Sequence, residues 1–401
     1  MLPCRATRVS WLAVLVWAAG LLPGHASFAV ASVSDGRVLH AGMSAPALFS
    51  AQVQLPATTS PSVMIATLHL GRRLLSHRVK LATGSTGVTV TFNLAQAHVP
   101  RFTSPMPYRF CVRPTDDSPR CSVGVIPLPV AVIHGIFGDL AALSPEMDPY
   151  PPLLAALRRS GYADTGGYRT LTFVRYPSVT AFLGLVDHSL QKRLFGDGVT
   201  DYAARYLAPA VQGLLAESYA ARVDLVGHSM GGLLARAYVR TPANAGRVRD
   251  VVMIGTPNLG SARTFMEVGS MANLPETARD LLPTYPYLYD EGQRGYLDPP
   301  VHNLFLSALN MRPFVAGVSI TCIYEGSFPT TATLVVRGGV GPNRYQVLRS
   351  LDAIGDGTVT AQSAILPGAS LYSLNDHIYH AQLPTDPHVQ KIVLHVLLAA
   401  T

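Results

Sequence analysis

Charged side chains, cysteines and long apolar runs are all scarce in this sequence. Asp, Glu, Lys and Arg make up only 14% of its 401 residues, against 48% hydrophobic residues, which is typical of a folded globular chain and excludes an intrinsically disordered one. The formal net charge is +7, but Lys and Arg are spread over short stretches without a dense basic block, which argues against nucleic-acid binding. The positive excess fits adsorption to anionic lipid or wall polymer, and it identifies no partner.

Cysteine occurs only four times, as Cys4, Cys111, Cys121 and Cys322. Cys111 and Cys121 flank a turn-rich segment between two strand-like runs, so an exported chain is expected to join them in a disulfide. Cys322 lies in an apolar strand pattern and is interpreted as a buried small hydrophobic residue. Because no further Cys or His stands at ligand spacing, the sequence predicts no structural zinc site.

The amino terminus has the features of a secretory signal peptide over residues 1–31. Arg5 and Arg8 form a basic start, the apolar run Trp11–Leu22 follows, and small residues then offer cleavage after Ala26 or Ala31. An uncleaved membrane anchor is the alternative, but the run is short for a membrane span. No later stretch reaches the length of a transmembrane helix. We therefore expect a secreted, extracytoplasmic protein.

Residues 32–126 have the pattern of short β-strands without a helix. Runs rich in Val, Thr, Tyr and Phe are separated by Gly, Pro, Ser and Asp at intervals typical of a small sandwich. These runs are Ser62–Leu70, Arg78–Leu81, Gly87–Phe92, Pro107–Val112 and Cys121–Ile126. The pattern predicts a β-sandwich-like accessory domain, with a substrate- or surface-binding module as the alternative.

The pattern changes at the start of a second predicted domain, residues 127–401. Val130–Ile133 is a continuous apolar run, as expected for a parallel strand that is buried on both faces. Strands and helices then alternate, which predicts an α/β fold with a doubly wound, mostly parallel sheet. The expected elements are helix Pro151–Ser160, strand Tyr168–Tyr176, helix Val199–Ser218, strand Arg222–Val226, helix Gly231–Arg240, strand Val248–Ile254, strand Val318–Tyr324, strand Ala369–Leu374 and helix Asp386–Leu398.

Two segments interrupt this alternation. Residues 177–198 contain apolar side chains at helical spacing, which fits either a surface helix packed on the sheet or a mobile lid over the site. Residues 261–313 are rich in Pro, Tyr and Leu and are interpreted as a cap insertion that forms part of an acyl pocket.

The motif that organises the second domain is Gly-His-Ser-Met-Gly at residues 227–231. It follows an apolar strand pattern and precedes a helix pattern, and its glycines leave room for a sharp turn from strand to helix. This context is typical of the nucleophile elbow of an α/β-hydrolase, with Ser229 as the nucleophile. A Gly/Ser loop that matches by chance is the plainer alternative.

A serine nucleophile needs a base, and the base needs an acid that orients it. Asp356 lies between two glycines after a late strand pattern, where exposed amides can keep its carboxylate ionised; Asp352 and Glu325 are fallback candidates. The base is expected between the last strand and the closing helix, where His377 and His380 stand. We favour His380, because Leu383 in its loop can anchor that loop against the core.

The tetrahedral intermediate of acyl transfer needs two backbone donors. One is the amide of Met230, directly after the nucleophile. The other is expected in the loop after the first parallel strand, where we choose the amide of Ile136, with Phe137 in reserve. His134 in the same loop is interpreted as a residue that braces the turn. This chemistry needs no metal and no organic cofactor.

Several of these segments together resemble the lecithin:cholesterol acyltransferase-like family and other lipases of the α/β-hydrolase superfamily. The Gly227–Gly232 motif matches the elbow of many lipases, and the segment after the next strand is similar to theirs. That segment is Ile254–Ser261. The signatures of the lecithin:cholesterol acyltransferase-like family then follow in order, at Ala278–Pro283 with Tyr287 and Tyr289, Cys322–Gly326 with Pro329 and Thr330, and Gly355–Val359. The resemblance covers about Val130 to Leu398.

The resemblance implies a serine hydrolase or acyltransferase that acts on ester-linked acyl chains, with a triad of Ser229, Asp356 and His380. Together with the signal-peptide pattern, it leads us to expect a secreted hydrolase of lipid esters, of the lipase or phospholipase type. Transfer to an alcohol acceptor, a short-chain esterase and a catalytically inactive binding protein are the alternatives. The loop at His134 and Gly135 is more similar to bacterial lipases than to the animal acyltransferases. The animal enzymes of this family typically have a lid that is closed by cysteines. That lid has no counterpart near Ala181–Phe195 in this sequence.

Overall fold

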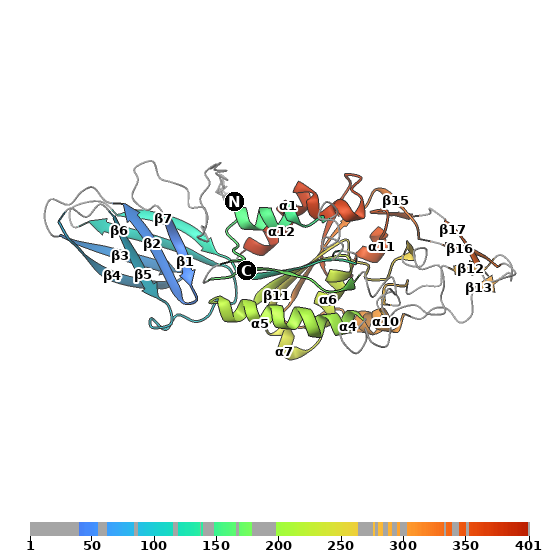
Figure 1. The fold of residues 1–401 in the computed structure, drawn as a ribbon, viewed down its shortest axis with the longest axis horizontal. Coiled ribbons are helices and arrows are strands. Elements are labelled where there is room, and N and C mark those ends of the chain that lie inside the picture. The colour runs from blue at the N-terminus through green and yellow to red at the C-terminus, as the bar shows by residue number, and fades with distance from the viewer. Residues whose placement is uncertain are drawn as a thin grey trace, which may run out of the picture.

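Two regions of regular structure follow each other along the chain in the computed structural model (Figure 1). An antiparallel β region comes first, and a parallel sheet covered by helices comes second. The structure describes residues 40–54, 62–83, 87–114, 119–136, 138, 148–165, 168–178, 198–263, 276, 280–283, 288–290, 295–296, 303–332, 334–338, 345–349 and 353–399. The predicted signal peptide and nearly all of the predicted lid lie outside these residues.

The first region is a β-sandwich of two antiparallel sheets. One sheet has the order β1-β2-β5, with β1 at His40–Ala45, β2 at Leu48–Gln54 and β5 at Gly87–Asn93. The other has the order β4-β3-β6-β7, with β4 at Arg73–Leu81, β3 at Ser62–Leu70, β6 at Met106–Pro114 and β7 at Arg120–Ile126. The strands predicted from the sequence did not include β1 and β2. Ala, Ser and Gly give β1 a weak strand signal, whereas β2 has the alternation of a half-buried strand and was missed.

Alternate side chains of both sheets fill one core between them. The rings of Phe49 and Tyr108 meet edge to face at 5.0 Å, and the Tyr108 hydroxyl donates to the backbone oxygen of Ala41 at 2.8 Å, which ties the sheets together. Cys111 and Cys121 stand opposite each other on β6 and β7 and form a disulfide. Cys322, in the second region, is a buried free cysteine.

The second region contains a sheet of six parallel strands in the order β19-β14-β11-β10-β8-β9. The strands span β8 Val130–Ile133, β9 Leu171–Val174, β10 Val223–His228, β11 Val248–Ile254, β14 Ser319–Glu325 and β19 Ser370–Leu374. Every residue of β8, β10 and β11 is buried, which is why these strands are almost continuously apolar in sequence. The predicted alternation of strands and helices is confirmed, and the chain has the α/β-hydrolase fold preceded by a small β-sandwich.

Helices cover both faces of this sheet (Figure 1). Helices α1 (Pro151–Arg159) and α12 (Pro387–Leu398) share one apolar core with one face of the sheet. The other face packs against α4 (Val199–Tyr202), a π-helical turn at Ala203–Leu207, α5 (Ala208–Glu217), α6 (Met230–Val239) and α7 (Pro242–Ala245). No helix in the described part of the chain is long and apolar enough to cross a membrane.

Short elements beyond the six parallel strands were not predicted. Strands β15 (Phe328–Thr330) and β18 (Ala353–Gly355) pair and lead into α11 (Ala361–Ala364). A separate sheet joins β12 (Leu288–Asp290), β13 (Gly295–Tyr296), β16 (Leu334–Gly338) and β17 (Tyr345–Arg349). Of the predicted cap insertion, the structure describes these first two strands, helix α10 (Leu304–Met311) and a few flanking residues.

The β-sandwich is attached at the amino ends of the parallel strands. The backbone of Phe102 bonds to Tyr219 and Ala221, which precede β10, at 3.0 and 2.7 Å. The Tyr219 hydroxyl donates to Val99 at 2.6 Å, and the Arg101 guanidinium donates to carbonyl groups at the end of α5. The sandwich therefore lies at the opposite end of the sheet from the loop that follows β10 (Figure 1).

Candidate active site

Ser229 lies at the carboxyl edge of the sheet, between the end of β10 and the start of α6. Its backbone has φ 54° and ψ −126°, a region that a serine rarely adopts, so the turn is strained. Hydrogen bonds on both sides hold it, since its amide donates to Ile254 at 2.8 Å and its carbonyl accepts from Gly232 at 3.0 Å. Strain that is held in this way at a serine between strand and helix is the geometry of a nucleophile elbow.

Asp356 and His380 come together beside this elbow. The Nδ1 atom of His380 is 2.6 Å from Oδ2 of Asp356, and both side chains are buried. The other carboxylate oxygen of Asp356 accepts from the backbone amides of Thr358 and Val359 at 3.0 and 2.7 Å. Because a carboxylate can only accept here, Nδ1 of His380 carries the proton and Nε2 is left as the basic nitrogen.

The end of β11 comes so close to this pair that only glycine fits there. Gly255 has φ 57°, and a Cβ atom at this position would lie 3.0 Å from Oδ2 of Asp356 and 3.2 Å from Nδ1 of His380. It would also meet a methyl group of Leu383 at 2.7 Å. The glycine therefore allows the carboxylate and the imidazole to sit against the strand that neighbours the nucleophile's own strand.

The other candidate acids and base lie elsewhere. His377 is exposed, and its Nδ1 is 3.3 Å from the Ser327 hydroxyl, not near Asp356. Glu325 is buried and accepts from Ser327 and from backbone amides in the loop before His380, so it holds that loop in place. Asp352 lies outside the described residues. The structure thus brings His380, and not His377, to Asp356.

The two predicted oxyanion donors flank the nucleophile. The amide of Met230 is at the first turn of α6, where amide groups have no acceptor within the helix. On the other side, a Cβ on Gly135 would lie 2.7 Å from Cβ of Ser229, so the loop backbone that leads to Ile136 touches the serine. Phe137, the reserve candidate, lies outside the described residues.

A chain of buried hydrogen bonds passes beneath the nucleophile and joins the two loops of the site. The Gly135 amide donates to the Tyr150 hydroxyl at 2.7 Å, and that hydroxyl lies 2.8 Å from Nδ1 of His228. Nε2 of His228 is 3.0 Å from the carbonyl oxygen of His380. Since a carbonyl only accepts, Nε2 of His228 carries the proton, and Nδ1 accepts from Tyr150. The chain thus links the loop that contains Gly135 and Ile136, which we call the oxyanion loop after its predicted role, to the loop that contains His380.

This chain requires a neutral imidazole at position 228. Burial lowers the pKa of His228 well below its usual value, and this effect outweighs the hydrogen bond to the His380 carbonyl, which raises that pKa. Burial also raises the pKa of the Tyr150 hydroxyl, which keeps that group a donor. The link is therefore held in a single protonation state, with a neutral imidazole at His228 and a protonated hydroxyl at Tyr150.

His134 braces the loop from its other side. Its Nε2 accepts from the Tyr176 amide at 3.1 Å, so Nδ1 carries the proton and donates to the Gly135 carbonyl at 2.6 Å. Its ring stacks on the Tyr176 ring at 4.0 Å. Both ring nitrogens are engaged, so the arrangement fits a bracing role for His134 and not that of a general base.

Helix α6 is anchored by a buried guanidinium. Arg236, with 2% exposure, donates to the side chains of Asn258 and Asn310, both at 2.9 Å, and to the Leu309 carbonyl at 3.2 Å. Burial lowers its pKa to about 10. These bonds connect the helix behind Ser229 to the loop after β11 and to α10.

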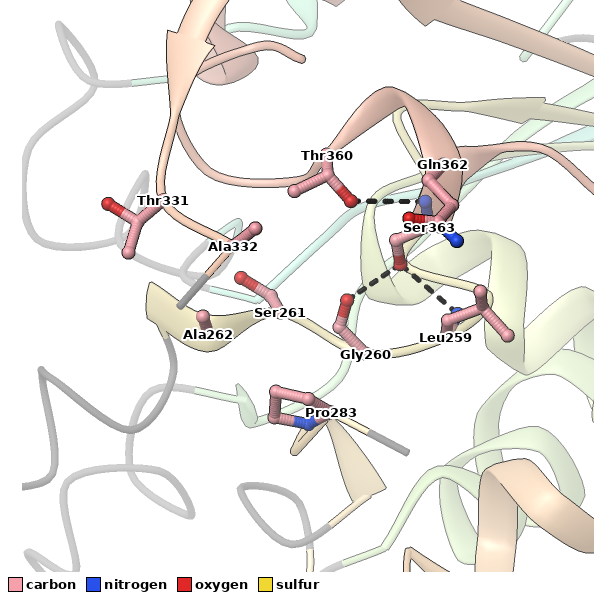
Figure 2. Close-up of a pocket in the computed structure, with 10 residues that line it drawn as sticks. All are labelled: Leu259, Gly260, Ser261, Ala262, Pro283, Thr331, Ala332, Thr360, Gln362 and Ser363. Carbon is pink, nitrogen blue, oxygen red and sulfur yellow. Dashed lines mark hydrogen bonds between the residues drawn. The ribbon is translucent and has the colours of Figure 1, made fainter. Parts of the chain in front are cut away.

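A cavity of about 420 Å³, which includes space open to solvent, lies beside the loop that follows Asp356, which we call the acid loop (Figure 2). The Ser261 hydroxyl, at its wall, donates to the carbonyl of Thr358 at 2.6 Å, two residues after Asp356 in the chain. Both apolar and hydroxyl side chains line it, including Leu259, Ala262, Pro283, Thr331 and Thr360. Among the residues described, no group of three or more His, Cys, Asp or Glu side chains could hold a metal ion.

Sequence reasoning missed Tyr150, Gly255 and Arg236 and gave His228 no role of its own. Tyr150 lies in no recognised motif. His228 occupies a variable position of Gly-x-Ser-x-Gly, where the motif assigns no role to the side chain. The one available signal was Gly255, which directly follows an apolar strand pattern, as glycines do where a strand ends against a close neighbour.

Comparison with known proteins gives one family match. Residues 195–273, which include Ser229, match the PGAP1-like alpha/beta domain family. No curated protein sequence matches this chain. Among solved structures, the lipase BlEst2 of Bacillus licheniformis in its propeptide form is similar with a TM-score of 0.42 and 14% identity, over 69% of this chain and 51% of that one.

Two further solved structures are similar at the same level. The metagenomic carboxyl esterase MGS0156 has a TM-score of 0.35 and 19% identity, over 63% of this chain and 64% of that chain. The lin2722 gene product of Listeria innocua has a TM-score of 0.36 and 15% identity, over 69% and 95% of the two chains. This chain spans about half of the propeptide form of the Bacillus lipase. Similarities this distant carry no argument about activity, which rests on the site itself.

Proposed function

We propose that this protein is a carboxylic ester hydrolase with Ser229 as nucleophile, His380 as general base and Asp356 as the acid that orients it. The observation that carries the proposal is the 2.6 Å contact between His380 and a buried, doubly amide-bonded Asp356, on the same edge of the sheet as a serine in a strained elbow. These are the parts that a serine needs in order to act as a nucleophile near neutral pH.

In the first half of the reaction, the Ser229 hydroxyl gives its proton to Nε2 of His380 while Oγ attacks the ester carbonyl. Asp356 holds the Nδ1–H tautomer and stabilises the imidazolium that forms. The amides of Met230 and Ile136 stabilise the oxyanion. The imidazolium then protonates the departing alcohol, and an acyl-enzyme remains. Water attacks this ester by the same route in reverse and releases the carboxylic acid and Ser229.

Lipid esters are the proposed substrate class. The succession of segments that resembles the lecithin:cholesterol acyltransferase-like family supports this class, and the cavity beside the acid loop offers Leu259, Ala262 and Pro283 to an apolar substrate group (Figure 2). Transfer of the acyl group to an alcohol instead of water is the second form of the same chemistry. The disulfide between Cys111 and Cys121 supports the further proposal that the chain is exported.

The test is hydrolysis of an ester series from acetyl to long-chain acyl groups, measured below and above the concentration at which each substrate aggregates. We expect activity that rises with chain length and with aggregation, and that is lost in Ser229→Ala, Asp356→Ala and His380→Ala. His377→Ala is the matched control, because it removes an exposed imidazole three residues away from His380 and should leave the rate unchanged.

Two results would contradict the proposal. Wild-type activity in Ser229→Ala would remove the serine from the mechanism, and loss of activity in His377→Ala with retention in His380→Ala would exchange the base. An added alcohol separates the two forms of the chemistry, because an acyltransferase gives the new ester in preference to the free acid.

A further inference from the structure

The outward face of the sheet β4-β3-β6-β7 differs from an ordinary sandwich surface. Along β3, residues at odd positions point outward and residues at even positions are buried in the core, and the register carries this face onto the neighbouring strands. Apolar side chains are exposed on this face, and five of them are 36 to 69% exposed: Val63, Ile65, Leu74, Val123 and Val125. Single exposed apolar residues are common on protein surfaces and need no explanation, whereas five on one sheet face form a group that points to an interaction.

Cations stand between these apolar side chains. In the cross-strand register, Ile65 lies between Arg78 on β4 and Arg113 on β6. Arg109 pairs with Val123, and Lys80 pairs with Val63. We call these nine residues the basic sheet face: Val63, Ile65, Leu74, Arg78, Lys80, Arg109, Arg113, Val123 and Val125.

The charge of this face is of one sign. None of the four strands contains an Asp or a Glu. Arg78, Lys80, Arg109 and Arg113 are all exposed, and none of them forms an ion pair within the part of the chain that the structure describes. The four charges are thus available to a partner with negative charge.

The opposite face of the same sandwich serves as an internal comparison. The outward side chains of β2 and β5 are uncharged and polar, as in Ser50, Gln52, Gln54, Thr89 and Thr91. Both faces belong to one small fold, and Gln52, Gln54, Thr89 and Thr91 are exposed as the cations of the other face are. The fold alone therefore does not require cations and apolar groups on the other face.

We propose that the basic sheet face docks on an anionic lipid surface. Arginine and lysine side chains bind headgroup phosphates, while apolar side chains between them enter the boundary between headgroups and acyl chains. A soluble polyanion would use the cations but would leave the five apolar side chains in water. The combination on one flat face is what favours a membrane over a dissolved acidic polymer.

The docking would keep the enzyme at the source of its substrate, and only this consequence rests on the proposed ester hydrolysis. The sandwich is joined to the hydrolase region by backbone and side-chain hydrogen bonds around Phe102 and Arg101. A lipid-bound sandwich therefore holds the catalytic region at a fixed position relative to the surface.

The experiment measures binding of the full chain to vesicles of phosphatidylcholine alone and of phosphatidylcholine mixed with an equal amount of phosphatidylglycerol. All binding forms carry Ser229→Ala, so that hydrolysis of the vesicles cannot disturb the measurement. We expect tight binding to the mixed vesicles only. Each cation near an anionic surface contributes roughly fivefold to the binding constant, so Arg78→Gln with Arg113→Gln should weaken binding by about 25-fold.

A charge-matched control uses the other face. Gln52→Glu with Gln54→Glu lowers the net charge by the same amount, with side chains of similar size, and should leave vesicle binding nearly unchanged. If both double variants lost the same amount of vesicle binding, only the total charge of the protein would matter, and the proposal would be overturned. Each double variant with Ser229 intact should hydrolyse a soluble short-chain ester at the wild-type rate, which separates a docking defect from a defect of the site.

The apolar residues decide between a lipid surface and a soluble polyanion. Leu74→Ser with Val123→Ser should weaken vesicle binding, most clearly at high salt, where the contribution of the charges is screened. Unchanged binding in this variant, together with equally tight binding of soluble polyphosphate by the parent protein, would show that the face binds polyanions and would refute the lipid proposal.

Discussion

Replacing Tyr150 by Phe removes one oxygen atom and, with it, the two hydrogen bonds that join the oxyanion loop to His228. The ring itself, with 1% of its surface exposed, keeps its packing among α1 and the sheet. The variant therefore tests the hydrogen-bonded link and not the hydrophobic core. It leaves the Gly135 amide and Nδ1 of His228 buried without their partner.

The expected loss of stability follows from those two groups. A buried polar group that loses its partner costs about 1–3 kcal/mol, so with two such groups the free energy of unfolding should fall by about 2–6 kcal/mol. Catalysis should fall as well, because the Gly135 amide anchors the backbone next to Ile136. Loss of an entire oxyanion donor costs about 10²–10³ in kcat, and a displaced donor should cost about 10–10². KM should change little, because the substrate's ground state does not need this donor.

Tyr162→Phe is the matched control. Tyr162 belongs to the same core cluster and is 3% exposed, but its hydroxyl has no hydrogen-bond partner in the described structure. Removing that hydroxyl leaves no orphaned group and should be neutral or stabilising. Urea unfolding of both variants and of the wild type, with kcat and KM for a soluble ester, gives the comparison. If Tyr150→Phe unfolds at the same urea concentration as Tyr162→Phe and retains wild-type kcat, the link does not hold the site, and the reasoning fails.

Two further perturbations test the neighbourhood of the site. Gly255→Ala should lower kcat by about 10² or more, because the added methyl group displaces the carboxylate of Asp356 and the imidazole of His380 from the geometry that the proposed mechanism needs. Gly246→Ala should keep the wild-type rate, because a Cβ there meets only an ordinary contact at 3.5 Å. Full activity in Gly255→Ala would contradict this account of the packing. The lowered pKa of His228 means that the unfolded chain binds a proton below about pH 6.5 that the folded chain does not, so stability is complete above that pH and falls by up to about 1.4 kcal/mol per pH unit below it. The free energy of unfolding, measured between pH 7 and about pH 5, should depend less steeply on pH in His228→Gln than in the wild type. His395→Gln, which replaces an exposed histidine, is the control and should keep the wild-type slope. The same slope in all three proteins would rule out a buried neutral imidazole at position 228.

The sheet and its elbow could be predicted because their signals are local. A strand buried on both faces must be apolar throughout, as Val130–Ile133 and Val248–Ile254 are, and a strand that turns directly into a helix requires small residues around Ser229. Strand β1 escaped prediction for the converse reason, because its Ala, Gly and Ser residues give a weak local signal and pack only where they meet the other sheet. Strand β2 was missed although its buried Phe49, Ala51 and Val53 alternate with polar residues, which is a local strand pattern.

Local patterns in the chain were enough to predict the alternation of strands and helices, the place of Ser229 in a sharp turn, and a short set of acids and histidines near it. Which of these acids and histidines meet depends on the folded arrangement. His377 and His380 are three residues apart in one loop, and the path of that loop over Leu383 and Gly255 sets His380 against Asp356 and leaves His377 in solvent. The same holds for side chains far apart in the chain, such as those that form the basic sheet face. Contacts of this kind depend on strand order and register, which arise from packing over the whole fold and leave no trace in the spacing of neighbouring residues.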